Sequence, residues 1–194
     1  INNKIPSCEV VLVVIDDKSL REIGRWPWKR EYYLEIFDFF ENYTNSKLIG
    51  YDGLIIAPDR EWEKSDEKFF NKIANYKKLT AGFAFSYDDF ENNIEQEKNK
   101  TYLDNKTKIK IIDKRSKKLI KSSDFKSFSA LLEPYFKNIN SLGFVNVPAD
   151  KDGYIRKTAH LINYKNRFYP SLTLKMYQQY TGINEFILGD KYLL

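Results

Sequence analysis

The sequence predicts an α/β fold: a three-layer sandwich with a mostly parallel central sheet, helices on both faces of that sheet and one β-hairpin excursion. Two observations predict it. Segments with strand and helix patterns alternate through the first 85 residues, which is typical of parallel strands joined by right-handed crossovers. The first strand pattern, residues 9–15 (EVVLVVI), is apolar without alternation. A strand that is apolar on both faces is typical of the middle of a sheet that helices cover.

The region after this strand predicts one helix and one further strand. Pro27 suits the first turn of a helix, because its missing N–H is not needed there. Aromatic residues then recur at three- and four-residue spacing at Tyr33, Phe37 and Phe40, which predicts an amphipathic helix. Residues 47–56 (KLIGYDGLII) predict a second buried strand, interrupted where an Asp-Gly pair favours a turn.

A second helix and a third strand complete the alternating part. Ser65 is of the type that caps helix N-termini, and the acids that follow it favour the first turn. The core face of this helix is expected to carry Phe69, Ile73 and Tyr76. Residues 79–85 (LTAGFAF) predict the third strand.

Residues 86–126 break the alternation. This stretch is polar, with five carboxylates between residues 88 and 97 and eight Lys or Arg against one Asp between residues 106 and 121. Its only strand-like parts are residues 108–112 and 118–120. We therefore predict a charged hairpin that leaves the core.

The remaining residues are expected to return to the core. We predict a short helix around residues 130–138 and two strands, residues 142–147 and 154–163, joined by a tight turn. A last helix is expected to open at Pro170 and to end at Gly182, which suits a C-terminal cap.

Length and composition predict a single globular domain, residues 1–194. The 42% hydrophobic content, with only 8 Gly and 6 Pro, excludes a disordered or collagen-like chain. The longest apolar run has six residues, too few for a membrane span. Cys8 is the only cysteine and His160 the only histidine, which excludes an internal disulfide and zinc sites of several Cys or His and disfavours histidine-based catalysis. The net charge of +5 is concentrated in the predicted hairpin, so we expect no nucleic-acid partner.

Acidic residues follow the first two predicted strands. Asp16 and Asp17 come after the first strand, and Asp52 comes after the second. Ligands bind at the carboxyl edge of open parallel sheets, and neighbouring carboxylates there could hold magnesium for a phosphotransferase or hydrolase. The same acids would equally cap the helix and the turn that follow them. Because no Gly-rich phosphate loop accompanies them, we expect no catalytic residue, cofactor or metal ligand in this chain.

The densest unusual feature is the segment Trp26-Pro27-Trp28-Lys29-Arg30. Two tryptophans that flank a proline could form an aromatic surface for a ligand, with the arginine pairing an anion. They could equally be a rigid packed plug over the edge of the sheet.

Several short segments together resemble the CHASE2 domain, a family of extracytoplasmic sensor modules, from residue 10 to about residue 180. The most specific are GRWPWKR at residues 24–30 and DKDGYIR at residues 150–156. The others are VIDDKSL at 14–20, GYD at 50–52, PD at 58–59, the helix-opening Asp66, LGFVN at 142–146 and PSL at 170–172.

This resemblance implies the input part of a receptor rather than an enzyme. Such domains lie in the periplasm or at the cell exterior and are joined by membrane helices to cytoplasmic cyclases or kinases. The partners that the resemblance implies are therefore a small-molecule or envelope ligand, the membrane helices and output domain of the same polypeptide, and a second copy of the chain in a homodimer. Family members usually continue past the Pro-Ser-Leu helix, so we expect this chain to lack the C-terminal part.

The candidate ligand-binding residues are Asp16, Trp26, Trp28, Arg30, Asp52, Asp152 and Arg156. Two other functions stay open at this point. One is the metal-dependent phosphotransferase or hydrolase that uses Asp16, Asp17 and Asp52. The other is an envelope-interaction module whose basic hairpin contacts anionic headgroups or polymer.

Overall fold

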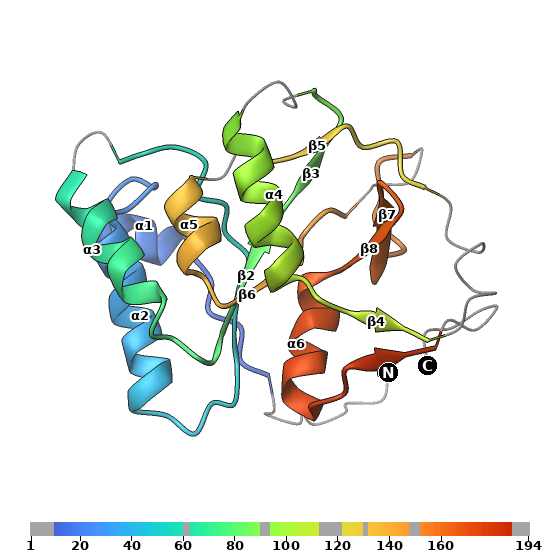
Figure 1. Ribbon diagram of the computed structural model, residues 1–194. Helices are drawn as coiled ribbons and strands as arrows, with labels where there is room; N and C mark the ends of the chain where they lie inside the picture. The colour runs from blue at the N-terminus through green and yellow to red at the C-terminus, as the bar shows by residue number, and fades with distance from the viewer. Residues whose placement is uncertain are drawn as a thin grey trace.

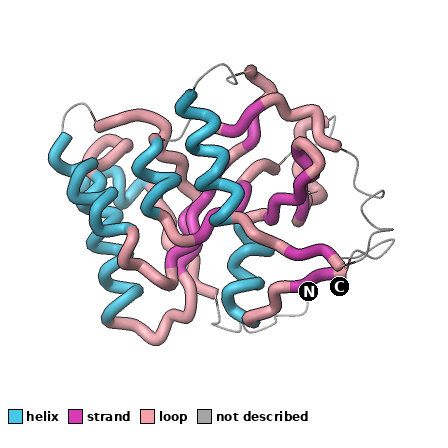
Figure 2. The backbone as a smooth tube through the Cα atoms, in the orientation of Figure 1, coloured by secondary structure: helices cyan, strands magenta, loops and turns pink. Residues whose placement is uncertain are grey.

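The fold is mixed α/β, with small parallel and antiparallel sheets between helices (Figures 1 and 2). The computed structural model describes residues 10–59, 63–89, 94–112, 122–129, 132–147 and 152–187. The helices in these residues are α1 (Asp17–Ile23), α2 (Arg30–Asn42), α3 (Glu63–Ile73), α4 (Ile94–Lys106), α5 (Glu133–Asn138) and α6 (Leu172–Thr181). The strands are β1 (Ile49–Tyr51), β2 (Leu79–Phe83), β3 (Phe85–Ser86), β4 (Lys110–Ile111), β5 (Ser127–Phe128), β6 (Ser141–Phe144), β7 (Leu161–Tyr164), β8 (Arg167–Pro170) and β9 (Glu185–Phe186).

A three-stranded parallel sheet of order β1-β2-β6 forms the centre of the molecule. Strands β1 and β2 lie within the predicted segments 47–56 and 79–85, and β6 overlaps the predicted segment 142–147 but begins one residue earlier. Figure 1 shows α2, α3 and α5 grouped on one side of these strands and α6 on the other. Among the described residues the other strands form two-stranded pairs, so the larger parallel sheet of a three-layer sandwich stays a prediction.

One face of the sheet is built from small residues and lies directly against α6. A Cβ atom at Gly50 would lie 2.6 Å from Met176 Sδ, and one at Gly143 would lie 2.5 Å from Leu172 Cα. Between these two positions, the hydroxyl of Thr80 donates to the side-chain oxygen of Gln179. The helix therefore packs on the backbone of the sheet, which larger side chains at these positions would push away.

The opposite face of the sheet carries the large side chains. Because side chains alternate along a strand, Tyr51, Phe83 and Phe144 point away from α6 and into the main hydrophobic core. The ring of Phe37, from α2, lies 5.4 Å from the Tyr51 ring in an edge-to-face contact. The core residues predicted for the second helix, with Phe69 among them, are all buried here.

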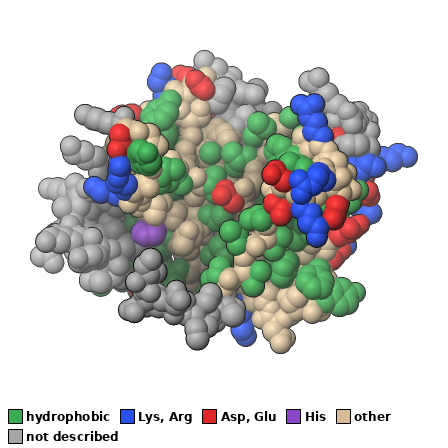
Figure 3. Space-filling model, turned by 180° about the vertical axis from the view of Figure 1, so that it is seen from behind, with side chains coloured by type: hydrophobic (Ala, Val, Ile, Leu, Met, Phe, Trp, Pro, Cys, Tyr) green, Lys and Arg blue, Asp and Glu red, His purple; other side chains and the backbone are tan. Residues whose placement is uncertain are grey.

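The prediction of a central strand at residues 9–15 is wrong for residues 10–15. These residues form no strand, and their side chains are exposed, from 45% for Ile15 to 87% for Val10. Residue 9 lies outside the described residues. An apolar run indicates a preference for burial, but a strand also needs a neighbouring backbone to pair with, which the run does not specify. Figure 3 shows hydrophobic side chains across the centre of the face seen from behind.

The sequence analysis expects no helix in residues 86–126, but α4 occupies much of this stretch, and the turn of the predicted hairpin lies outside the described residues. Among the described side chains of α4, Leu103 lies in the main core and Tyr102 packs at its edge, so few apolar residues anchor the helix there. An ion pair of 2.8 Å between Lys100 and Asp104, one turn apart, supports it instead. The strand predicted at residues 108–112 is present as β4, but it pairs in parallel with β9, and residues 118–120 lie outside the described residues.

The C-terminal part contains both predicted helices, but α6 begins at Leu172 and not at Pro170, which is the last residue of β8, and the strands also differ from the prediction. Helix α5 is present, and α6 begins after the N-cap Ser171 and ends at Gly182, which has a φ of 72°. The strand expected over residues 154–163 is limited to β7, which starts only at Leu161. Strand β8, which the sequence analysis missed, pairs with β7 across a tight turn at Lys165 and Asn166, both with positive φ.

Candidate functional site

The carboxyl ends of β1 and β2 are joined by one buried side chain. The hydroxyl of Tyr135, from α5, lies 3.3 Å from the carbonyl oxygens of both Gly53 and Gly82. Tyr135 has no exposed surface, and burial raises the pKa of its hydroxyl. The phenol therefore stays neutral and able to donate, and it holds this edge of the sheet together.

Tyr51 and Asp52 form the end of β1 at this edge. The Tyr51 ring lies so close to Gly53 that a Cβ atom there would be 2.2 Å from the ring. The pKa of Tyr51 is raised, chiefly by burial and further by Tyr33 and Asp52, while Arg30 opposes the rise. Asp52 is exposed and forms no ion pair with any residue that the structure describes. It is therefore a carboxylate open to an external partner.

The segment that leads into α2 contacts this edge through Trp26. The Trp26 side chain is 54% exposed, and its indole N–H donates to the Tyr33 hydroxyl at 3.0 Å. The Tyr33 ring in turn contacts the Tyr51 ring edge to face, with centroids 5.7 Å apart. A continuous chain of aromatic contacts thus runs from an exposed tryptophan to the end of a sheet strand.

Trp28 has a different environment. Its side chain is 7% exposed, and its indole N–H donates to the Gly24 carbonyl at 2.8 Å. Gly24 caps α1 with a φ of 109°, a conformation that favours glycine. Each tryptophan therefore matches one of the two alternatives from the sequence analysis. Trp28 is packed in the protein, and Trp26 presents an exposed aromatic surface.

Arg30 is occupied by the protein itself. Its Nε donates to Asp66 Oδ1 at 3.1 Å, and its Nη2 donates to the Ala57 carbonyl at 3.1 Å. The second Asp66 oxygen accepts from the Asp59 backbone N–H at 2.6 Å. The side chains of Arg30 and Asp66 are only 13% and 10% exposed. This pair ties the start of α2, the start of α3 and the loop after β1 to one another.

The other candidate residues lie in local contacts. Asp16 is the N-cap of α1, where it accepts from the backbone N–H of Ser19 at 2.8 Å, and hydrogen bonds from Ser19 lower its pKa. Asp152 and Arg156 pair with each other through two hydrogen bonds of 2.8 and 2.9 Å on the surface. Trp26 is linked to Tyr51 through Tyr33, and both Arg30 and Asp52 influence the pKa of Tyr51, whereas the contacts described for Asp16, Asp152 and Arg156 are local to their own segments.

The carboxylates that could bind magnesium are not clustered. In the part of the chain that the structure describes, no group of three or more His, Cys, Asp or Glu side chains could hold a metal ion. Asp16 is engaged as a helix cap, and no contact relates it to Asp52. The site thus presents an exposed indole face and an exposed carboxylate, and its described residues form no cluster of metal ligands.

Three residues of this site were missed as functional candidates. Tyr33 was assigned only to the core face of a helix, and Tyr51 only to a strand. Asp66 was interpreted as a residue that opens a helix, while its carboxylate in fact binds Arg30, 36 positions earlier. The spacing of residues in the sequence does not reveal an ion pair between such distant positions. A single arginine beside a predicted core is nevertheless a signal, because a buried charge needs a partner of opposite charge elsewhere in the chain.

Among the described residues no helix is long and apolar enough to cross a membrane. No curated protein and no solved structure matches the chain significantly. The family model of the CHASE2 domain matches residues 2–192, nearly the whole chain. The chain therefore belongs to the CHASE2 family, whose members are extracellular sensor domains of signalling receptors.

Proposed function

We propose that this chain is the input domain of a membrane-anchored signalling protein, that it binds a ligand outside the cytoplasm, and that it passes a conformational signal to a cytoplasmic cyclase or kinase. Membership of the CHASE2 family supports the sensory part of this proposal. The observation that carries the binding site is the aromatic chain from exposed Trp26 through Tyr33 to Tyr51.

The ligand is proposed to lie on the Trp26 indole and to pair with Asp52. A flat or apolar group would cover the exposed face of the indole, and a cationic or hydrogen-bonding group would meet the carboxylate. Arg30 is not assigned to the ligand, because its donors are directed to Asp66 and Ala57. Its role here is to position the loop that follows β1.

The signal is proposed to travel through packed side chains. A ligand changes the population of a conformation only by binding one state more tightly than another. A displacement of Trp26 would shift Tyr33, which lies on α2, and Tyr51, which lies on β1. The receptor site is thus linked both to a long helix and to the central sheet.

The test uses the full-length protein that carries this domain, with its cyclase or kinase output as the readout. We expect Trp26→Ala and Tyr33→Phe to change the basal output in the same direction, because both remove the hydrogen bond between these residues. Tyr154→Phe is the control, since Tyr154 is 68% exposed and lies in neither α2 nor the sheet. Unchanged output in both variants, with an intact fold, would show that the aromatic chain carries no signal.

No observation favours the metal-dependent phosphotransferase or hydrolase over this proposal, because the carboxylates it needs are not grouped. The envelope-interaction function depends on the basic stretch of the excursion, and most of that stretch lies outside the described residues. It stays a hypothesis.

A further inference from the structure

A recess lies away from the candidate site, where residues of β4 and the segment before it meet the turn between β7 and β8 and the start of β8. It has a volume of about 430 Å³, in the range of pockets that hold small organic molecules. The described residues of its lining come from two segments of chain almost sixty residues apart, namely Lys108, Ile109, Ile111, Asn166, Arg167 and Phe168. None of these residues belongs to the site at the end of β1.

Half of the lining is apolar and is fixed by a small core of its own. Ile109, Ile111 and Phe168 pack against buried Leu174 and Phe186, in a cluster separate from the main core. The apolar wall is therefore held by packing from α6 and β9. A ligand that placed a hydrocarbon or aromatic group on this wall would remove further apolar surface from water.

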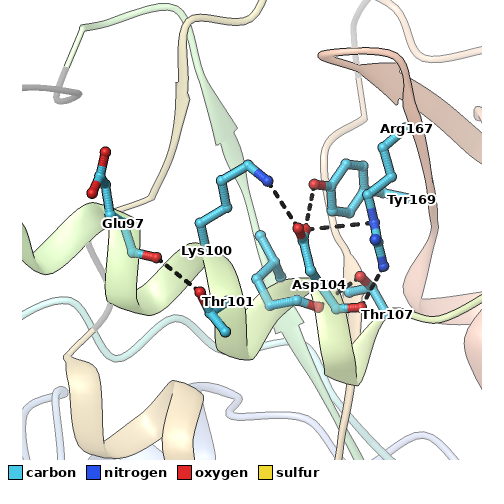
Figure 4. Close-up of polar contacts among 8 residues, drawn as sticks. Glu97, Lys100, Thr101, Asp104, Thr107, Arg167 and Tyr169 are labelled. Carbon is cyan, nitrogen blue, oxygen red and sulfur yellow. Dashed lines mark hydrogen bonds and ion pairs between the residues drawn. The ribbon is translucent and has the colours of Figure 1, made fainter.

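The other described lining residues are Lys108, Asn166 and Arg167, of which two are cationic, and the arginine is held in place. Figure 4 shows Lys100, Tyr169 and Arg167 converging on Asp104 of α4. Arg167 Nε lies 3.5 Å from Asp104 Oδ1, and its Nη2 donates to the Asp104 carbonyl. The guanidinium also lies over the Tyr169 ring, 5.6 Å from its centroid. These contacts fix the guanidinium and leave Nη1 without a hydrogen bond to any described residue.

Lys108 supplies a second cation beside Arg167. Its side chain is exposed, and its ammonium forms no ion pair with a residue that the structure describes. Arg167 Nη1 and the Lys108 ammonium thus both line the recess and can donate further hydrogen bonds, next to an apolar wall. Paired cationic donors of this kind recognise carboxylate and phosphate groups.

A third cation, Lys175, lies behind this lining and adds to the positive charge of the recess. Lys175 of α6 is only 9% exposed, and its ammonium donates to the Lys108 carbonyl at 3.1 Å and to Gln178 Oε1 at 2.8 Å. Both acceptors are neutral, so no carboxylate compensates this charge, and burial lowers the pKa of Lys175 to about 8. The acids nearby are already paired. Asp104 forms ion pairs with Lys100 and with Arg167, and Glu185 forms an ion pair with Lys110.

From these observations we propose that this recess binds a small organic anion, with its carboxylate between Lys108 and Arg167 and its apolar group on Ile109, Ile111 and Phe168. The inference is independent of the proposed sensory function. Binding to the recess is measured on the chain itself. If no binding is found, the proposal of a ligand site around Trp26 is not affected.

The test is calorimetric titration of the chain with 3-phenylpropionate, with its neutral amide and with acetate. We expect 3-phenylpropionate to bind at least about tenfold more tightly than either of the other two, since only it presents both a charge and an apolar group. No binding of 3-phenylpropionate up to about 10 mM would overturn the proposal. Equal binding of the amide or of acetate would overturn it too, because the recess would then not combine charge and apolar recognition.

Variants locate the binding. Lys108→Glu is expected to weaken 3-phenylpropionate at least about tenfold, while Lys77→Glu, the same charge change at an exposed lysine after α3, is expected to leave it unchanged. An equal loss in the two variants would assign the effect to net charge and overturn the site. Phe168→Ala is expected to weaken 3-phenylpropionate more than acetate, and circular dichroism confirms the fold of each variant.

Discussion

Arg30 and Asp66 form a nearly buried ion pair, 3.1 Å from Nε to Oδ1, between the starts of α2 and α3. Because Asp66 also accepts from the backbone N–H of Asp59 and Arg30 also donates to the Ala57 carbonyl, the pair fixes the loop that follows β1. Arg30, which the sequence analysis includes among the candidate ligand residues, thus has its donors directed to other parts of the domain.

We expect Arg30→Gln to lower the free energy of unfolding by about 3 kcal/mol, because it leaves the Asp66 carboxylate buried without its cation. Urea denaturation measures this loss. The double variant with Asp66→Asn should lose less than the sum of the two single losses. Arg25→Gln, at an exposed arginine five residues earlier, is the control and should change stability little. Additive losses in the cycle would mean that the two side chains do not interact.

Tyr135→Phe should destabilise the domain by about 1–2 kcal/mol, because the carbonyls of Gly53 and Gly82 lose their shared donor inside the core. Amide hydrogen exchange should become faster at the carboxyl ends of β1 and β2. Tyr154→Phe removes a hydroxyl from an exposed tyrosine and serves as the comparison. A Tyr135→Phe variant as stable as the parent would show that this hydroxyl does not join the strands.

Two glycines on the α6 face of the sheet should respond differently to the same added methyl group. At Gly143 the new Cβ would meet the backbone of Leu172 at 2.5 Å, and backbone cannot yield without moving the helix. At Gly50 the obstacle is the flexible end of Met176. We expect Gly143→Ala to cost about 2 kcal/mol or more, and Gly50→Ala to cost clearly less, in thermal or urea unfolding. The reverse order would contradict the close contact between α6 and β6.

Lys175 should make stability depend on pH in the alkaline range. Its folded pKa of about 8 lies below the ordinary 10.5, so the cost of burying its charge is complete below pH 8 and absent above pH 10.5. The stability of the parent chain relative to Lys175→Met should therefore rise between these two pH values, by on the order of 2 kcal/mol. Urea unfolding of both proteins at pH 7 and near pH 10 measures the difference. A constant difference would show that Lys175 is not desolvated.

Much of the central fold could be predicted from local patterns. The three strands of the sheet, helix α2 with its buried Tyr33 and Phe37, and α6 with its glycine cap all follow from periodicity and capping residues. These elements could be found because each depends on residues that are close together in the sequence.

The errors have a common cause, since each depends on a partner that is distant in the sequence. Helix α4 has little apolar pattern, and contacts such as that between Asp104 and Arg167 anchor it. Strand β4 pairs with β9, about 75 residues away, and no pattern in the neighbouring sequence predicts this pairing. At the candidate site the sequence indicated Trp26 and Asp52, but the pairing of Arg30 with Asp66 could be found only in the structure.

The exposed apolar run at residues 10–15 has a consequence for the behaviour of the domain in solution. An uncovered row of β-branched side chains makes molecules adhere to one another, while the net charge of +5 keeps them apart. Added salt screens that repulsion, and sulfate also strengthens apolar contacts. The purified domain is therefore expected to stay clear in dilute buffer and to precipitate at unusually low ammonium sulfate, and a charge placed within this run should restore its solubility.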